Sequence, residues 1–455
     1  MLPGLAAAER AVRLAAGAAV LVLLQVGSSI TVGPNVNVSH APLPQSEVRA
    51  AVDPSDPSVL LAGSNSNGEG AMRVYGSTDG GATWSSDPLP SPPAPGTRCA
   101  ADPAVAIDRH GRQYFLWVGA DPCTPPTASL FLARRESATA AWTLAREPIV
   151  PPLPDGSFDD NPWLAVDTSA ASPYADRLYV AWFRYSRRGD LGLMLVHSDD
   201  HGATWSSPVR VNDAGRSDGY PVLSLGPNGD LYVAWHDFGH RLIMLDRSTD
   251  GGATFGRDRS FRIRVRDEAG CPNGVSIPAQ PLRCVRSNPN LAVTGNRVLV
   301  SYGDRARNGS QDVLVARYDR ALRRLRAFTR RVGAPERRPR DQFWPAATLD
   351  AATGLVWLCF YDTGGAPARM RARFSCTYSR DGREWAAVRR VASAPSNERA
   401  AGADEGEYGD YESVVAAGGI AHPVWSDSRD LRRRGEEIYT ARVAARPPTG
   451  PGRRG

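Results

Sequence analysis

Internal repetition is the feature of this 455-residue chain that most constrains its fold, because a repeated unit determines the architecture before any single residue does. A short pattern, S-x-D-x-G-x-T-[WF], occurs three times in full and once in a shortened form. Its positions are Ser77, Asp79, Gly81 and Trp84; Ser198, Asp200, Gly202 and Trp205; Ser248, Asp250, Gly252 and Phe255; and Ser379, Asp381 and Trp385. Four copies spread along the chain indicate one repeating supersecondary unit rather than a few unrelated domains.

A second repeat is a short β-type run that opens each unit after a polar residue. It recurs seven times, about 60 residues apart, at residues 49–53, 104–108, 164–167, 222–226, 291–293, 346–350 and 414–417. Most openings are followed by two further β-rich runs, the last of which ends at the S-x-D pattern or at a degraded version of it. No long amphipathic helix pattern interrupts the series.

Short, evenly spaced strands joined by Gly, Pro, Asn and Asp turns predict an all-β chain, and one aromatic motif per unit is typical of a β-propeller. Seven openings predict seven blades of four strands. The last unit has only three strand-like runs, whereas residues 30–38 form a β-like run with no unit of their own. We therefore expect this N-terminal strand to complete the last blade and close the ring.

The S-x-D-x-G pattern has a structural interpretation that needs no chemistry. We expect it between the third and fourth strands of a blade, where the Ser hydroxyl and Asp carboxylate can accept turn N–H groups. The Gly supplies a positive φ, and the aromatic residue packs between sheets. The pattern therefore identifies the fold and not the reaction.

The N-terminal segment resembles a secretory signal. Arg10 and Arg13 precede an apolar run over residues 14–26, which is shorter than the ~20 residues of a membrane span. We predict a signal segment at 1–29, a single propeller at 30–445 and a disordered tail at 446–455, and we leave open whether the signal is cleaved. The expected location is secreted or extracytoplasmic, with no membrane attachment after cleavage.

Six cysteines fit an exported protein, because disulfides form outside the cytoplasm. Six cysteines allow 15 pairings, but these fall into three pairs that are local in the sequence. We predict the pairs Cys99 with Cys123, Cys271 with Cys284, and Cys359 with Cys376. Because no pair has C-x-x-C spacing, we read no metal site from them.

The charge composition argues against a nucleic-acid partner. The chain contains no lysine, so all 54 basic residues are arginine, against 48 acidic residues. In a chain with this bias an arginine cluster is weak evidence for nucleic-acid binding, and the basic excess forms no single stripe in the sequence.

The repeated pattern resembles the Asp-box (BNR) repeats of the sialidase superfamily, and the repeats cover residues 47–443. The best-known sialidases of this kind have six blades, so six remains the alternative to the seven counted here. The resemblance implies a retaining exo-glycosidase that holds a substrate carboxylate with arginines and uses Tyr, assisted by Glu, with an Asp as acid/base.

Carried over residue by residue, the resemblance implies the following site. Tyr411 is the nucleophile, with Glu405, Glu407 and Glu412 as alternatives for its carboxylate partner. The loop before the first S-x-D pattern has no Asp, so Glu69 is the only carboxylate there for the acid/base role. Arg49, Arg305 and Arg429 would bind the substrate carboxylate. For each residue the alternative is a solvated rim or an inter-blade hydrogen bond.

The aligned repeats also show a ring of acidic positions. One set lies just before the first strands, at Asp102, Asp160, Asp218, Asn288, Asp341 and Asp410. A second set lies at the ends of second strands, at Asp237, Asp304, Asp362 and Asp427. Both sets should face the same mouth of the channel, where they either cap neighbouring backbone or bind a polyol or a hard cation such as Ca²⁺. Asp410, Asp341 and Asp237 are our candidates for substrate binding.

Two functions remain in view from the sequence. The first is an exo-glycosidase of the exo-α-sialidase type that acts on glycans, and the second is a non-catalytic propeller that binds carbohydrate or protein at the cell surface or outside the cell. A negative ring would oppose an anionic sugar unless the arginines neutralise it. We expect a monomer that binds a glycan or glycoprotein and needs no cofactor.

Overall fold

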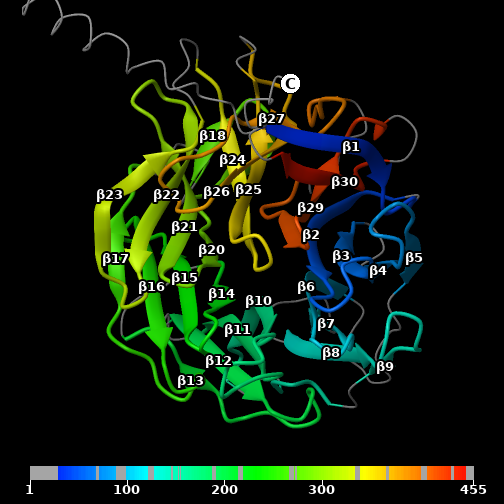
Figure 1. Ribbon diagram of the computed structural model, residues 1–455, viewed down its shortest axis with the longest axis vertical. Coiled ribbons are helices and arrows are strands. Elements are labelled where there is room, and N and C mark those ends of the chain that lie inside the picture. Colours follow the sequence, from blue (N-terminus) through cyan, green and yellow to red (C-terminus); the bar gives the residue numbers. More distant parts are fainter. Residues whose placement is uncertain are drawn as a thin grey trace, which may run out of the picture.

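The computed structural model shows a closed ring of seven four-stranded antiparallel sheets (Figure 1). The structure describes residues 29–446 except 42, 68–70, 89–98, 121–127, 145–146, 152, 154, 187–190, 214–218, 266–270, 272–273, 334–338, 365–367, 401–406 and 432–434. Seven blades confirm the main expectation over the six-blade alternative. The described residues contain no helix capable of crossing a membrane. The expected signal segment and tail lie almost entirely outside the described residues.

Blades 1 to 6 each contain four strands that are consecutive in the sequence. Blades 1 to 3 are formed by β2 (Gln45–Val52), β3 (Leu60–Ser66), β4 (Ala71–Ser77) and β5 (Ser85–Pro88); β6 (Cys99–Ile107), β7 (Gln113–Ala120), β8 (Ser129–Arg135) and β9 (Thr143–Leu144); and β10 (Phe158–Val166), β11 (Leu178–Tyr185), β12 (Leu191–Ser198) and β13 (Val209–Arg210).

The remaining blades repeat this arrangement. Blades 4 to 6 are formed by β14 (Val222–Leu225), β15 (Leu231–Asp237), β16 (Leu242–Ser248) and β17 (Arg259–Arg262); β20 (Asn290–Val293), β21 (Arg297–Arg305), β22 (Gln311–Asp319) and β23 (Arg324–Arg331); and β24 (Gln342–Asp350), β25 (Leu355–Asp362), β26 (Arg373–Ser379) and β27 (Arg389–Arg390). A separate hairpin, β18 (Val275–Ile277) and β19 (Gln280–Val285), precedes blade 5.

Blade 7 closes the ring with strands from both ends of the described chain. It contains β28 (Ser413–Ala417), β29 (Ile420–Asp427), β30 (Glu437–Arg446) and the N-terminal β1 (Ser29–Asn37). β1 pairs antiparallel with β30, from Ser29 opposite Arg446 to Asn37 opposite Tyr439. The expected closure by the N-terminal strand is therefore confirmed.

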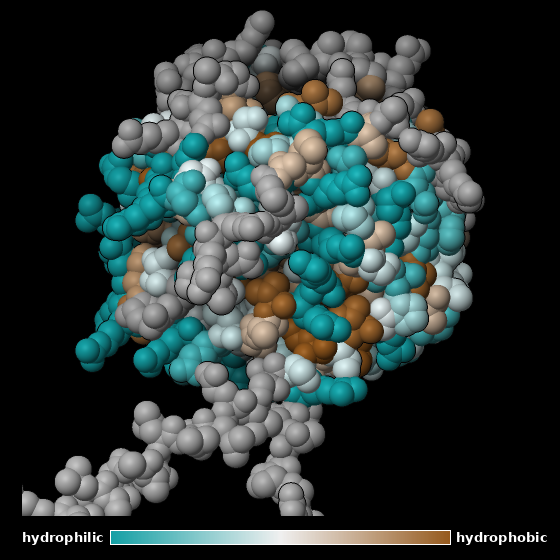
Figure 2. Space-filling model, turned by 90° about the horizontal axis from the view of Figure 1, so that it is seen from above, coloured by the Kyte–Doolittle hydropathy of each residue, from teal (hydrophilic) through white to brown (hydrophobic). Residues whose placement is uncertain are grey.

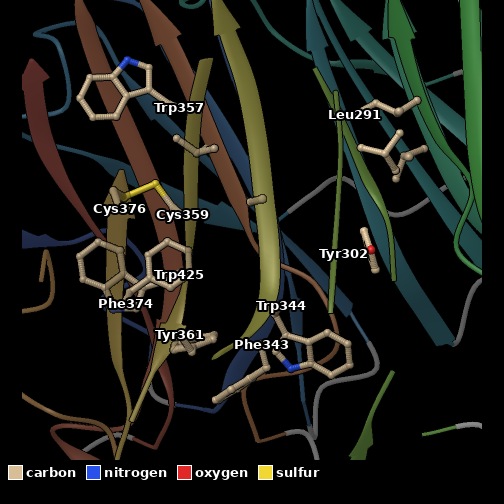
Figure 3. Packing of buried hydrophobic residues seen from close by; sticks show 14 of the residues in the cluster. Leu291, Tyr302, Phe343, Trp344, Trp357, Cys359, Tyr361, Phe374, Cys376 and Trp425 are labelled. Carbon is tan, nitrogen blue, oxygen red and sulfur yellow. A yellow bond between two sulfur atoms is a disulfide. The ribbon is translucent and has the colours of Figure 1, made fainter. Parts of the chain in front are cut away.

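The first strand of every blade lies nearest the axis, and the second is covered on both faces by neighbouring blades. β7, β15 and β25 are buried along their whole length, which explains their almost uninterrupted apolar sequence. Fully buried tryptophans recur in second strands at Trp117, Trp182, Trp235, Trp357 and Trp425. In Figure 3, Trp425 of blade 7 stacks on Phe374 of blade 6, with ring centroids 5.5 Å apart. Aromatic packing of this kind joins the blades.

The S-x-D-x-G turns lie between third and fourth strands, as expected. In the first copy, Gly81 N–H donates to Ser77 Oγ at 2.9 Å, and Thr83 N–H and Oγ1 donate to the Asp79 carboxylate at 2.9 and 2.6 Å. The copies that begin at Ser198 and Ser248 form the same contacts. These hydrogen bonds lower the pKa of Asp79 to about 2. The pattern is therefore a turn motif held by its own side chains.

Two of the three predicted disulfides lie in the described residues. Cys271 bonds to Cys284, and Cys359 bonds to Cys376 directly opposite it across β25 and β26. Cys123 lies outside the described residues, so the pairing with Cys99 is not described. The Cys271–Cys284 bond closes the segment that holds the β18–β19 hairpin.

Candidate functional site

Strained backbone surrounds one mouth of the central channel. Near the start of the first strand, the pairing with the second strand shifts register in blades 1, 2, 3 and 6. One residue at or just before the first strand of five blades has a positive φ: Glu47 (59°), Asp102 (56°), Asn161 (52°), Tyr220 (53°) and Trp344 (49°). Non-glycine residues rarely adopt this conformation, and such strain clusters at functional sites. Three of these residues, Glu47, Asp102 and Tyr220, belong to the cluster of side chains at this mouth.

Glu47 is a buried carboxyl group at this mouth. Its carboxyl oxygens accept hydrogen bonds from Asn65 Nδ2, at 2.6 Å, and from Arg283 Nη1. Asn65 Oδ1 in turn accepts the main-chain N–H of Asp102 at 3.1 Å, which links blades 1 and 2. Burial, reinforced by the charge of Asp410 and opposed by Arg283, raises the pKa of Glu47 to about 8. Glu47 therefore holds a proton at neutral pH.

Tyr411 and two aspartates form the centre of the cluster. The Tyr411 hydroxyl donates to Asp102 Oδ1 at 3.2 Å, and the Asp102 carboxyl is hydrogen-bonded to that of Asp160. Burial and then the negative charge of Asp160 raise the pKa of Asp102 well above its usual range, and burial also raises the pKa of Asp160. Two adjacent buried carboxyls cannot both ionise readily, so this pair holds one proton between them.

Arg49 lies between two aromatic rings. Its guanidinium carbon is 3.9 Å from the ring centroid of Tyr411 and 4.2 Å from that of Trp163. Burial lowers its pKa, but an arginine stays protonated in proteins. Burial is the main cause that raises the pKa of Tyr411, and the nearby carboxylates add to it. The positive charge of Arg49 opposes that rise. Arg49 is thus placed to stabilise a phenolate on Tyr411.

A second tyrosine connects the cluster to blades 4 and 5. The Tyr220 hydroxyl donates to Asp410, and Arg286 Nη1 donates to the Tyr220 hydroxyl at 2.6 Å. The main-chain carbonyl of Asp410 accepts Asn288 Nδ2 at 3.1 Å. Burial and then the charge of Asp410 raise the pKa of Tyr220 well above its usual range. Arg286 therefore contributes a third guanidinium group, beside Arg49 and Arg283.

The β18–β19 hairpin delivers Arg283 to this site. The main-chain N–H groups of Leu282 and Arg283 donate to the Glu407 carboxylate at 2.9 and 3.0 Å. Gln280 Nε2 donates to the carbonyl of Gly409 at 3.0 Å. The hairpin is thereby fixed against the segment that leads to Tyr411. Sequence reasoning missed Arg283 and Arg286, because a hairpin outside the repeat has no counterpart in other blades. It also missed Glu47, although Glu47 lies in the first strand of blade 1 with a positive φ, as Asp102 does in blade 2.

The other arginines that the sequence proposed are not part of this cluster. Arg429 donates to both carboxylate oxygens of Asp427, at 2.8 and 2.6 Å, and to Asn35 Oδ1 at 3.1 Å. Arg305 is the last residue of β21, opposite Gln311 of β22. The contacts that define the cluster include neither arginine. Arg283 and Arg286 lie where Arg305 and Arg429 were expected.

The expected carboxylates divide into two groups. Glu412 accepts the Tyr361 hydroxyl at 2.6 Å and the Ser426 N–H at 3.2 Å, so it joins blades 6 and 7. Its contacts are with those blades and not with Tyr411. Glu69, Glu405 and Asp218 lie outside the described residues.

Asp341 and Asp237 also have local partners rather than a place in the cluster. Asp341 Oδ1 accepts the Gln311 N–H at 3.0 Å and Arg369 Nη1 at 3.0 Å, which links blades 5 and 6. Asp237 accepts the N–H of His240 at 3.0 Å within its own turn. Of the predicted acidic ring, Asp102, Asp160 and Asp410 come together. In the described ranges, no three carboxylate, imidazole or thiolate groups are arranged to hold a metal ion.

Two cavities meet the cluster. One of about 20 Å³ lies against Arg49, Tyr220, Trp344, Asp410 and Tyr411. A cavity of this size holds a water molecule. The other, about 200 Å³, is the channel itself, and the first strands of all seven blades line it.

No protein-family model matches the sequence, and no curated protein sequence matches it significantly. Several solved structures are similar to this chain, among them the following three. A protein of unknown function from Dyadobacter fermentans is 13% identical, with a TM-score of 0.48, over 92% of this chain and 99% of that one. Hadza microbial sialidase Hz136 is 15% identical, with a TM-score of 0.49, over 90% and 68%. Trypanosoma rangeli sialidase in complex with sialic acid is 12% identical, with a TM-score of 0.49, over 90% and 58%. At these identities and TM-scores, the similarity assigns no role to any residue of this chain.

Proposed function

We propose that this chain is a retaining exo-glycosidase of the sialidase type, with Tyr411 as its nucleophile. The observation that carries the proposal is the hydrogen bond from the Tyr411 hydroxyl to Asp102, formed with Arg49 on the face of the same ring. A phenol is a weak nucleophile until a base takes its proton. The Asp102–Asp160 pair is that base, and the guanidinium group of Arg49 stabilises the resulting phenolate.

Glu47 is the proton donor in this proposal, because its pKa of about 8 keeps it protonated at neutral pH. In the first step, the Tyr411 oxygen bonds to the anomeric carbon and its proton moves to Asp102, which passes its own proton to Asp160. The bond to the leaving oxygen breaks, and that oxygen takes the proton of Glu47. In the second step, water attacks the anomeric carbon and gives its proton to Glu47, while Tyr411 leaves and regains its own.

Three arginines support a substrate that carries a carboxylate. Arg49 comes from β2, and Arg283 and Arg286 come from the end of the β18–β19 hairpin; the three meet around Glu47 and Asp410. An arginine can bind a carboxylate through two parallel hydrogen bonds. A tyrosine nucleophile suits such a substrate, because a carboxylate nucleophile would be repelled by it.

The proposal includes the nature of the repeats and the location of the protein. The four S-x-D-x-G turns are Asp-box repeats in this interpretation, and their side-chain geometry supports it. Secretion is supported by two disulfides, since such bonds form in oxidising compartments. A glycan or glycoprotein outside the cytoplasm is then the ligand.

One observation favours a second function, a non-catalytic propeller that binds carbohydrate or protein. The cavity beside Tyr411 has a volume of only about 20 Å³, far below that of a sugar ring. In this alternative, the same mouth is a binding surface and its hydrogen bonds fix the blades.

Release of a fluorogenic aglycone from sialosides and neutral glycosides separates the two functions. The chain without residues 1–28 is compared with Tyr411→Phe and Asp102→Asn, and Tyr378→Phe in β26 is the matched control. We expect release from sialosides, a loss of at least about 100-fold in the first two variants, and normal release in the control. No turnover of any glycoside, or turnover unchanged by Tyr411→Phe, would exclude the proposed mechanism.

A further inference from the structure

Two neighbouring edge strands concentrate positive charge on the outer rim, away from the channel mouth. Residues 257–264 and 317–331 contain eleven arginines and two aspartates, whereas the whole chain has 54 basic and 48 acidic residues. These segments include β17 of blade 4 and β23 of blade 5, which lie side by side at the rim (Figure 1). The general bias toward arginine does not explain this local excess, because acidic residues are almost absent from it.

A cavity of about 640 Å³ lies between these strands. Its lining includes Arg257, Arg259, Arg323 and Arg324, all of them exposed. Within the described ranges, none of these four guanidinium groups takes part in an ion pair. Elsewhere in the two segments, Arg320 is paired with Asp230 and Arg331 with Asp312. The unpaired charge of the rim is therefore that of the four cavity arginines, beside Asp258, which also lines the cavity.

One arginine fixes the seam between the two blades. Arg324 Nη2 donates to the carbonyl of Ser260 at 2.7 Å, and its guanidinium carbon is 5.0 Å from the ring centroid of Phe328. Asp258 is held by Asp213, since each aspartate accepts the main-chain N–H of the other, at 3.1 and 3.2 Å. These contacts fix Arg324 and Asp258, two of the residues that line the cavity. The guanidinium groups of Arg257, Arg259 and Arg323 lie beside them.

From this arrangement we infer that the β17–β23 rim is a second binding site, for an anionic polysaccharide bearing sulfate or carboxylate groups. Guanidinium groups match both anions in shape and charge. The cavity volume falls in the range of ligand sites and accommodates one or two sugar rings. Single-stranded nucleic acid is disfavoured, because it needs exposed aromatic rings for stacking, and Tyr318, which lines the cavity, is only 1% exposed.

Few large hydrophobic side chains are exposed in the part of the chain that the structure describes. Polar side chains cover much of the face shown in Figure 2, and hydrophobic patches lie among them, mainly toward the lower centre. Among the described residues, the exposed large hydrophobic side chains are Leu282 and Met370. Charge is therefore the feature through which the rim would select a partner.

Binding of the chain without residues 1–28 to immobilised dextran sulfate tests the inference, with neutral dextran of the same length alongside. The triple variant Arg257→Gln/Arg259→Gln/Arg323→Gln removes three charges and leaves Arg324 at the seam. We expect wild-type binding to dextran sulfate and not to dextran, and about a tenfold or greater loss of affinity in the variant. We also expect the variant to show a shallower dependence of affinity on salt.

A matched control removes three exposed arginines from the corresponding edge of blade 6, as Arg383→Gln/Arg389→Gln/Arg390→Gln. It changes the net charge equally, so we expect near-normal binding. An equal loss in both triple variants would show a nonspecific charge effect and overturn the site. Absence of wild-type binding, or tighter binding to duplex DNA at the same salt, would also overturn it. Binding is read without turnover, so the outcome is independent of the proposed activity.

Discussion

Asn35 is predicted to be the side chain through which the N-terminal strand is fastened to its neighbours. It lies in β1, after a shift in the β1–β30 register. Its side chain is hydrogen-bonded to the segment that follows β27 of blade 6 and to Arg429 of blade 7. Its Nδ2 donates to the carbonyl of Val391 at 2.9 Å, and its Oδ1 accepts Ser393 N–H at 2.7 Å and Arg429 Nη1 at 3.1 Å. Arg429 Nη2 also donates to Oδ1, at 3.1 Å, so Asn35→Ala removes the hydrogen bonds to all three partners at once.

The expected cost follows from these contacts. A neutral hydrogen bond contributes about 1 kcal/mol to stability, and one to a charged group about 1.5–3 kcal/mol. Because Asn35 is half-buried and Arg429 keeps its ion pair with Asp427, we expect a loss of about 2–3 kcal/mol in the free energy of unfolding. Equilibrium urea unfolding followed by tryptophan fluorescence measures it.

Thr31→Val in the same strand is the control. The Thr31 hydroxyl has a single contact, to the carbonyl of Ala444 at 3.2 Å, so its loss should cost about 1 kcal/mol or less. If Asn35→Ala cost no more than Thr31→Val, β1 would not fasten the ring as described, and the account of closure would be wrong.

Three further outcomes are expected. The native pKa of Glu47, about 8, exceeds its ordinary value of 4.5, so its contribution to the free energy of unfolding is full below pH 4.5 and is lost as pH rises through 8. In urea unfolding, Glu47→Gln should flatten this pH dependence. The same variant should abolish glycoside release. Gly202→Ala should lower the free energy of unfolding by about 1–3 kcal/mol, because φ is 81° at this position and the new Cβ would lie 2.6 Å from the Leu132 side chain. In Gly295→Ala the new Cβ would meet no atom within 4 Å, so thermal unfolding should be nearly unchanged. Cys271→Ser removes the disulfide that closes the hairpin bearing Arg283. It should reduce glycoside release strongly and leave the melting temperature almost unchanged. A large fall in the melting temperature together with the loss of release would contradict the role given to the hairpin.

The sequence predicts the fold because the information that specifies it is local and repeated. Each S-x-D-x-G turn forms its own hydrogen bonds, as Ser77 and Asp79 do, so the pattern keeps its meaning wherever it occurs. The unpaired run over residues 30–38 could be assigned to blade 7 because a three-stranded last unit lacked an edge. Regular turns and strand counts therefore suffice for seven blades and their closure.

The candidate site is less predictable because its side chains meet through long-range contacts. Asp102 could be proposed from its position in the repeat, and Tyr411 and Arg49 from the resemblance to Asp-box propellers. Arg283 could not, because its hairpin has no equivalent in other blades. A position at the end of a second strand likewise does not reveal that the guanidinium group of Arg429 is bound by the nearby Asp427.

A signal for the strained mouth was nevertheless present in the sequence. Asp102, Asn161, Tyr220 and Trp344 each precede a proline and each adopt a positive φ. Proline lacks an N–H, so it suits the unpaired position of a bulge. Reading these X-Pro pairs together would have placed the mouth of the channel.

The proposed nucleophile is tested most directly by trapping the covalent intermediate with a fluorinated sialosyl fluoride and locating the adduct by peptide mass spectrometry. The retaining mechanism predicts one added glycosyl group per chain, attached to Tyr411 and absent in Tyr411→Phe. An adduct on a carboxylate such as Asp102, or no adduct under conditions that release aglycone, would contradict it.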